Sequence, residues 1–231
     1  ALGLDPKAGG FDFNLGFLIQ KEYDPSVFFL PIDFIYLVLL GIIIGIFAEL
    51  YSRFVLLMQN LGKKWYKNKF VLKMSICGLI LGSIYAFLPN TFHNLDELQK
   101  IIAEQNTSIG IALLAVLVLF ITTGLAAASG APGGLFYPML TLGGSIGLIM
   151  GSWVEIATGH APSTYIFAGM GAFVAGCSRT PITAMFLAFA LTKNLLIMKP
   201  VLISCIASFL IARAFNEESI YERQIQIELE D

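Results

Sequence analysis

Four apolar runs of membrane-spanning length recur along this 231-residue chain, at 28–50, 70–88, 108–128 and 195–214. The first of them contains only two charged residues, Asp33 and Glu49. About 20 apolar residues suffice for a helix to cross the hydrocarbon core, where unsatisfied backbone groups leave only helices and closed barrels as spanning structures. Only 13% of the residues are charged, against about a quarter in soluble domains. The sequence therefore predicts an all-α, polytopic membrane protein.

Basic residues predict how the chain is oriented. A lysine cluster follows the first apolar run and comprises Lys63, Lys64, Lys67, Lys69 and Lys73. Because short cytoplasmic loops are enriched in Lys and Arg, we expect this loop to face the cytoplasm. The expected organisation is an extracytoplasmic tail or loop at 1–27, a transmembrane domain at 28–215 and a short cytoplasmic C-terminal helix at 216–231, in a cell membrane or inner membrane.

Residues that usually bind metals or nucleic acid are sparse or poorly spaced. Cys77, Cys177 and Cys205 lie in apolar segments without CxxC or Cys–His spacing, and His93 and His160 lie in predicted loops. The net charge of −2 is too small to favour a nucleic-acid partner. We therefore expect no metal site, no cofactor and no catalytic residue, and a protein that is not an enzyme.

The apolar segments differ in length and pattern. A helix over 32–61 is longer than the hydrocarbon core and must tilt or protrude, and its small residues Gly41, Gly45 and Ala48 favour close approach of another helix. An amphipathic surface segment is expected at 95–104. Three later pieces, at 135–154, 165–177 and 182–191, are interpreted as too short to cross alone. Such pieces are typical of tilted, re-entrant and broken transporter helices.

A glycine-proline break separates two apolar stretches at 130–138, which read Gly-Ala-Pro-Gly-Gly-Leu-Phe-Tyr-Pro. Gly133 and Gly134 permit unusual dihedrals and, with Pro138, are expected to shape this loop. The residues after the glycines restart a helix whose first N–H groups have no intrahelical acceptors. These donors and the helix dipole form an anion site. The nearest cation in the later sequence is Arg179, so the anion would be held by neutral donors and could leave again.

Three ordered motifs resemble the CLC family of chloride channels and chloride/proton exchangers. The break at 130–138 is similar to that family's GGxFxP signature and precedes a small-residue segment at 142–151. The sequences AGMGA at 168–172 and RTPIT at 179–183 follow at the expected distances. The resemblance runs from about Phe34 to Tyr221 and corresponds to the C-terminal half of a member, so it implies half of an inverted-repeat architecture.

The resemblance implies specific roles for residues of this chain. Leu135 and Phe136 would donate backbone N–H groups to a central chloride ion, the bound substrate, and the hydroxyl of Tyr221 would donate from the other side. The loops that carry a second hydroxyl and the gating glutamate do not occur in these residues, which implies an N-terminal half as a partner. Ala190 stands where many members carry glutamate. The implied activity is chloride/proton antiport by a homodimer, with a passive chloride channel as the alternative.

Three other readings remain open. Gly143-Gly144-Ser145-Ile146-Gly147 matches the G-x-S-x-G pattern of a hydrolase nucleophile, here Ser145, although the pattern requires a strand-turn-helix. A sodium-coupled organic anion transporter would need acidic ligands at membrane depth, yet Glu155 is the only carboxylate between Leu113 and Leu210. The chain could also assemble with copies of itself through apolar residues such as Met185, Phe186, Phe189 and Leu196.

Overall fold

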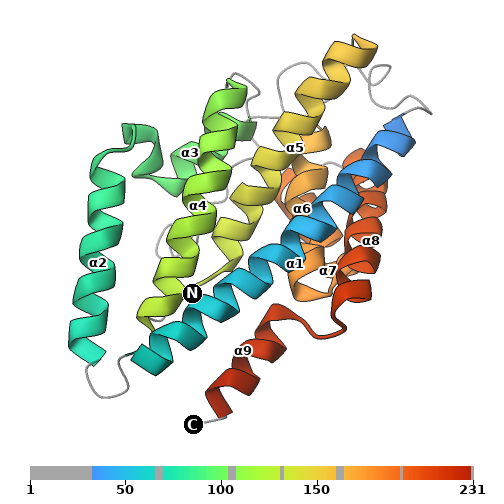
Figure 1. Cartoon of the computed structure of the whole chain (residues 1–231). Coiled ribbons are helices and arrows are strands. Elements are labelled where there is room, and N and C mark those ends of the chain that lie inside the picture. Colours follow the sequence, from blue (N-terminus) through green and yellow to red (C-terminus); the bar gives the residue numbers. More distant parts are fainter. Residues whose placement is uncertain are drawn as a thin grey trace, which may run out of the picture.

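A computed structural model describes residues 33–65, 70–103, 108–130, 133–159, 164–192 and 195–229 of the chain. Within these ranges the chain is helical, as the apolar runs predicted (Figure 1). The α-helices are α1 Asp33–Trp65, α2 Phe70–Ala86, α3 Leu95–Ala103, α4 Ile109–Ser129, α5 Phe136–Thr158, α6 Thr164–Ser178, α7 Pro181–Thr192, α8 Met198–Phe215 and α9 Ile220–Leu229. Short 3₁₀ turns occupy η3 Asn90–Phe92 and η4 Leu195–Ile197.

The longest helix, α1, crosses the bundle obliquely (Figure 1). Its 33 residues span about 50 Å at 1.5 Å per residue, against roughly 30 Å of hydrocarbon. The expected tilt or protrusion follows from this mismatch. The structure extends the helix by one turn beyond the expected end at residue 61. The segment 1–27, expected to be extracytoplasmic, lies outside the described residues.

One of the three expected short pieces is in fact a full-length helix. The segment expected at 135–154 forms the continuous 23-residue helix α5, which is long and apolar enough to cross a membrane. Its glycines suggested interruption because glycine weakens an isolated helix, but packing against α6 compensates. The other two pieces are short, as expected, and form α6 and α7. The second predicted span, 70–88, is also short, since α2 has 17 residues.

The centre of the bundle is α6, which α1, α5, α7 and α8 surround. Every residue from Thr164 to Cys177 is buried. Glycines bring α5 and α6 together, since a Cβ atom at Gly143 would collide with the carbonyl oxygen of Gly169, and one at Gly147 with that of Tyr165. Such backbone contact is the usual way in which helices associate in lipid. Because neighbouring helices cover α6, this helix need not be long enough to span the membrane.

Small residues along α1 pack against α8 and α6, which confirms the expectation for Gly41, Gly45 and Ala48. A Cβ atom at Gly41 would lie 2.6 Å from the Ser204 carbonyl oxygen, and one at Gly45 would lie 2.8 Å from the Ser208 carbonyl oxygen. Ala48 faces Gly176 of α6, where an added Cβ would lie 2.7 Å from the Ala48 Cβ. This seam places the middle of α1 directly beside the C-terminal half of α6.

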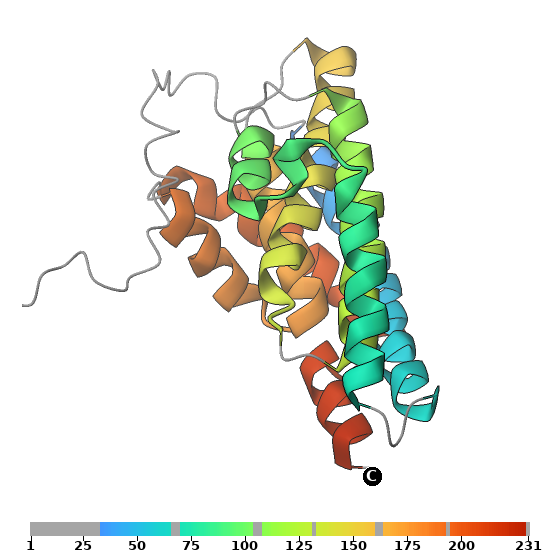
Figure 2. The ribbon, with the colours of Figure 1, turned by 90° about the vertical axis from the view of Figure 1, so that its left-hand side faces the viewer.

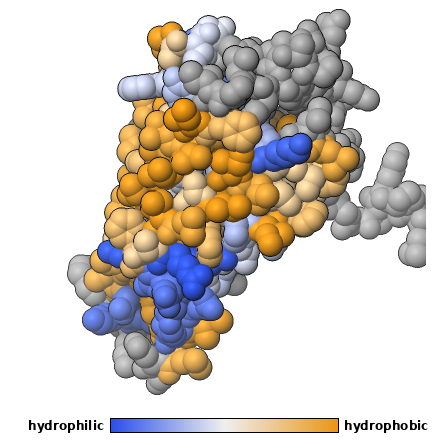
Figure 3. Space-filling view, turned by 90° about the vertical axis from the view of Figure 1, so that its right-hand side faces the viewer, coloured by the Kyte–Doolittle hydropathy of each residue, from blue (hydrophilic) through white to orange (hydrophobic). Residues whose placement is uncertain are grey.

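The outer surface is apolar and its lower end is polar. Figure 3 shows a broad hydrophobic region above a hydrophilic end, where α9 lies in Figure 1. Large apolar side chains are exposed on the outer helices, among them Val71 and Leu79 of α2, Leu117 of α4, and Ile206 and Leu210 of α8. The packing partner of α2 within the described residues is α4 (Figure 2). An apolar girdle of this kind is the surface of a multi-pass membrane protein.

Candidate functional site

The glycine-proline break begins where α4 ends. Gly130 is the C-cap of α4 and adopts a left-handed conformation with φ of 73°, and its N–H donates to the carbonyl oxygen of Ala127 over 3.2 Å. Glycine is the residue that adopts this conformation without a Cβ penalty. The turn directs the chain back towards the bundle, and α5 then runs antiparallel to α4 (Figure 1). Residues 131 and 132 of the break lie outside the described residues.

The first turn of α5 presents backbone donors at the other end of the break. Leu135 is the N-cap with no side-chain cap hydrogen bond, and its carbonyl oxygen accepts the first bond from the N–H of Met139 over 3.1 Å. By helix geometry, the N–H groups at the start of α5 have no acceptor inside the helix. Phe136 is partly exposed, at 36%. The local structure thus has the features expected of an anion-binding helix start.

The residues expected to shape this loop have different surroundings. Gly133 and Gly134 are exposed, and a Cβ atom added at Gly134 would meet no atom within 4 Å among the described residues. Pro138 is buried in the first turn of α5, a position at which the missing N–H costs no intrahelical bond. Pro138 therefore belongs to the helix start and not to the loop.

Tyr221 lies in the first turn of α9, and a capping box fixes where that helix begins. The Ser219 hydroxyl accepts a hydrogen bond from the Glu222 N–H over 3.2 Å, and the Glu222 carboxylate accepts one from the Ser219 N–H over 2.6 Å. This reciprocal arrangement satisfies two donors at the helix start. The side chain of Tyr221 is 40% exposed. Tyr221 is thus accessible in part from outside the helix bundle.

The two helix starts face the same part of the molecule. In both ribbon views α5 begins in the lower half of the bundle and runs upwards, whereas α9 begins beneath it and runs downwards (Figures 1 and 2). The N-terminal ends of the two helices are therefore directed towards a shared region. Each end carries a partial positive charge from its helix dipole, so both ends favour an anion between them.

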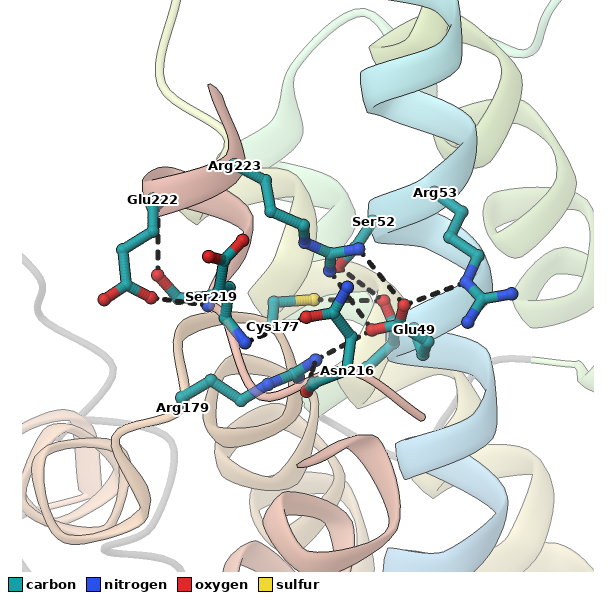
Figure 4. A network of polar contacts seen from close by, with 11 residues as sticks. Glu49, Ser52, Arg53, Cys177, Arg179, Asn216, Ser219, Glu222 and Arg223 are labelled. Carbon is teal, nitrogen blue, oxygen red and sulfur yellow. Dashed lines mark hydrogen bonds and ion pairs between the residues drawn. The ribbon is translucent and has the colours of Figure 1, made fainter. Parts of the chain in front are cut away.

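A buried ion cluster lies beside the start of α9 and was not predicted from the sequence. Glu49, in the middle of α1, is 3% exposed and pairs with three guanidinium groups (Figure 4). Arg53 donates to its Oε1 over 2.9 Å, and Arg179 donates to its Oε2 over 2.7 Å. Arg223 of α9 donates from Nη1 to Oε1 and from Nη2 to Oε2, each over 3.1 Å. One carboxylate thus connects α1, α6 and α9.

Arg179 contributes a second contact to this cluster. It follows the end of α6 with φ of 61°, a left-handed conformation that is uncommon for residues other than glycine. Its Nη2 also donates to the carbonyl oxygen of Asn216, in the turn between α8 and α9, over 3.0 Å. Arg179 Nε and Nη1 and Arg223 Nε are buried and have no acceptor among the described residues. The cluster therefore holds more positive charge than its single carboxylate neutralises.

Further contacts join the C-terminal half of α1 to α9. Gln224 Nε2 donates to Gln59 Oε1 over 3.4 Å, and Lys63 Nζ donates to the carbonyl oxygen of Ile227 over 2.8 Å. Together with the Glu49–Arg223 pair, these contacts advance in the same direction along both helices. A signal for the cluster was present in the sequence, because a charge at membrane depth such as Glu49 is costly and usually has a partner. The i,i+4 spacing identifies Arg53 as one partner, but no local pattern identifies Arg179 and Arg223.

The residues on which the alternative interpretations depend lie within ordinary helices. Ser145 is buried in the interior of α5, where its hydroxyl donates to the Thr141 carbonyl oxygen over 2.8 Å, so it is not on a strand-to-helix turn. Ala190 is exposed on α7. Among the proposed contact residues on α7, Phe186 is exposed and Met185 is buried.

Within the part of the chain that the structure describes, no group of three or more His, Cys, Asp or Glu side chains has the arrangement of a metal site.

Comparison with known proteins gives matches over most of the chain. The family model described as "Voltage gated chloride channel" matches residues 11–213. The H(+)/Cl(-) exchange transporter ClcA of Vibrio parahaemolyticus is 29% identical over 191 residues, which cover 80% of this chain and 41% of that protein. The transporter of the same name from Klebsiella pneumoniae is 30% identical over 203 residues, which cover 85% of this chain and 43% of that protein. The chain thus spans less than half the length of these curated relatives.

Two solved structures share the fold. A slow cyanobacterial Cl-/H+ antiporter aligns with a TM-score of 0.74 and 24% identity over 87% of this chain and 48% of that one. A eukaryotic CLC transporter aligns with a TM-score of 0.71 and 21% identity over 88% of this chain and 37% of that one. Both alignments cover part of a longer transporter, in agreement with the partial coverage of the sequence relatives.

Proposed function

Because the chain belongs to the voltage gated chloride channel family, whose model matches residues 11–213, we propose that it forms part of a protein that exchanges chloride for protons across a membrane. The matched relatives are named H(+)/Cl(-) exchange transporters. Since the chain covers 41% and 43% of those proteins, we further propose an N-terminal half as its partner. That half would carry the second anion-binding hydroxyl and the gating glutamate.

The observation that carries this proposal is that the start of α5 and the start of α9 are directed towards one region. Each of them offers hydrogen-bond donors there. The start of α5 has no side-chain cap, so the N–H groups of Leu135 and Phe136 are suited to an anion. Tyr221, at the start of α9, is 40% exposed, and its hydroxyl can donate a hydrogen bond. Gly133 and Gly134 would allow the backbone to approach the ion, and Pro138 would fix the first turn of α5. Chloride is then bound by neutral donors, which permit its release.

The proposed arrangement in the membrane follows from the basic end of α1. Lys63 and Lys64 lie in its last turn, so this end and α9 would face the cytoplasm. Under this topology α5 approaches the ion from the external side and Tyr221 from the cytoplasmic side. The segment 1–27 would be extracytoplasmic, 28–215 would form the transmembrane domain, and 216–231 would be cytoplasmic. A homodimer is the proposed assembly, with the exposed face of α7 at Phe186 as one candidate contact.

Flux measurements on the complete protein would test the proposal. Liposomes that contain the purified protein should release chloride without sodium, and an imposed chloride gradient should drive protons uphill. Chloride release without proton movement would instead indicate the passive channel. Absence of chloride flux in a monodisperse, folded preparation would contradict the proposed function, and a sodium requirement would favour the organic anion transporter.

A further inference from the structure

We propose that Glu49 is a positioning residue, which holds the start of α9 so that the Tyr221 hydroxyl lies where the anion binds. The inference rests on the proposed role of Tyr221 as an anion ligand. Both carboxylate oxygens of Glu49 accept hydrogen bonds from arginines (Figure 4), and a carboxylate is not a donor to an anion. Its effect would therefore be exerted through α9.

The first step of the argument is that α9 has little apolar packing of its own. Ile220 is the buried residue of this helix and Ile227 is partly buried against the core, whereas Tyr221, Ile225 and Leu229 are exposed. A ten-residue helix is marginal in isolation, because most helical stability in proteins comes from the packing of an apolar face. Polar contacts with α1 must therefore contribute much of what keeps α9 in its observed position.

The second step is that Glu49 holds α9 at two points. Arg223 forms a two-bond pair with the carboxylate, and this parallel geometry restricts orientation as well as distance. Arg179 connects the same carboxylate to the Asn216 carbonyl oxygen. One contact lies in the first turn of α9 and the other lies in the turn that precedes it. Together they restrain both the position and the direction of the helix start.

The third step concerns the rotation of α9 about its axis. Residues two apart in an α-helix are separated by about 200° around the axis, so Arg223 and Tyr221 point to nearly opposite sides. When Arg223 is anchored on Glu49, the direction in which Tyr221 leaves α9 is fixed as well. Tyr221 is 40% exposed in this arrangement. Release of Arg223 would free the helix to rotate and would carry the hydroxyl with it.

The fourth step is electrostatic. The side chains of Arg179 and Arg223 are 7% and 11% exposed, so water screens their charges poorly. Glu49 is the carboxylate that both contact. Without it, two like charges would remain close together at low dielectric, and this arrangement is strongly unfavourable. The least costly relaxation moves Arg223 and α9 away, because α6 is fixed in the core.

Chloride titration calorimetry on the complete, detergent-purified protein tests the inference. Glu49→Gln and Arg223→Gln should each weaken chloride binding about tenfold, which corresponds to loss of roughly one hydrogen bond to a charged ligand. The matched control is Arg53→Gln. Arg53 also pairs with Glu49, but it lies on the same helix and is 59% exposed, so its loss should leave the affinity within about twofold.

A Tyr221→Phe variant separates this inference from the proposed function. If Tyr221→Phe binds chloride like the wild type, Tyr221 is not a ligand and the proposed site is wrong. If it binds weakly while Glu49→Gln and Arg223→Gln bind normally, only the positioning inference is wrong. Should Glu49→Gln fail to fold, Arg223→Gln still provides the test, because Arg53 and Arg179 continue to neutralise the carboxylate.

The double variant Glu49→Gln/Tyr221→Phe distinguishes positioning from general loss of structure. If Glu49 acts through the Tyr221 hydroxyl, the double variant should bind chloride no more weakly than Tyr221→Phe alone. Losses that add would show that Glu49 affects the site by another route, and they would overturn the inference.

Discussion

The hydroxyl of Tyr165 donates a hydrogen bond to Oδ1 of Asp33 over 2.9 Å, although 132 residues separate the two positions. Both side chains are buried, at 1% and 2% exposure. The bond joins the start of α6 to the start of α1, and the pair formed by Arg179 and Glu49 joins the same two helices near the end of α6. The central helix is thus connected by polar contacts to α1 at two levels.

Tyr165→Phe should destabilise the protein by about 1–2 kcal/mol, because it leaves a buried carboxylate with fewer donors. Thermal unfolding of the detergent-purified protein would measure this change, with the fraction that stays monodisperse after heating as the readout. Tyr85→Phe removes the hydroxyl of a partly buried tyrosine on the peripheral helix α2 and is the matched control. Equal effects from both substitutions would show that the bond to Asp33 contributes nothing specific.

Gly143→Ala should destabilise the protein by about 1–3 kcal/mol, since the added methyl group collides with the Gly169 backbone and forces α5 away from α6. Gly78→Ala is the control on α2, where the added Cβ atom meets nothing within 4 Å of the described residues. That substitution should be neutral or slightly stabilising, because alanine favours helix more than glycine does. A Gly143→Ala variant as stable as Gly78→Ala would contradict the close contact.

Ser219→Ala should weaken chloride binding, because it removes the hydroxyl that accepts the Glu222 N–H and so loosens the start of α9. Loss of such a cap costs about 1 kcal/mol of helix stability. Calorimetric titration of the complete protein would detect the change in affinity. Ser83→Ala is a suitable comparison, since Ser83 is exposed within α2 and its hydroxyl donates to the Leu79 carbonyl oxygen one turn earlier. If both variants bind chloride like the wild type, the cap does not influence the site.

Cysteines placed at the two ends of α2 should react from opposite sides of the membrane. Lys64 precedes this helix, His93 follows it, and both side chains are exposed. In a background that lacks Cys77, Cys177 and Cys205, an impermeant thiol reagent should label His93→Cys from outside and Lys64→Cys only after the membrane is opened. Labelling of both positions from one side would contradict a spanning α2.

Hydropathy and small-residue spacing were sufficient to predict most helices of this fold. The Gly41, Gly45 and Ala48 seam was predictable because small residues at helical spacing have a direct consequence for packing. The continuity of α5 was missed, since glycines that weaken an isolated helix are here required by contact with α6. The Glu49 cluster was missed because its partners Arg179 and Arg223 are 130 and 174 residues away in the chain. The ligand roles of Leu135, Phe136 and Tyr221 stay predictions.

The seam between α1 and α8 also has a consequence for biosynthesis. The Leu37 carbonyl oxygen accepts a hydrogen bond from the Ser204 hydroxyl, 167 residues later. At roughly 5–20 residues per second, a ribosome needs about 10–30 s to reach α8 after it has released α1. During that interval the glycine face of α1 lies open to lipid or to other nascent helices, so an insertase or chaperone that shields this face should raise the yield of correctly assembled protein.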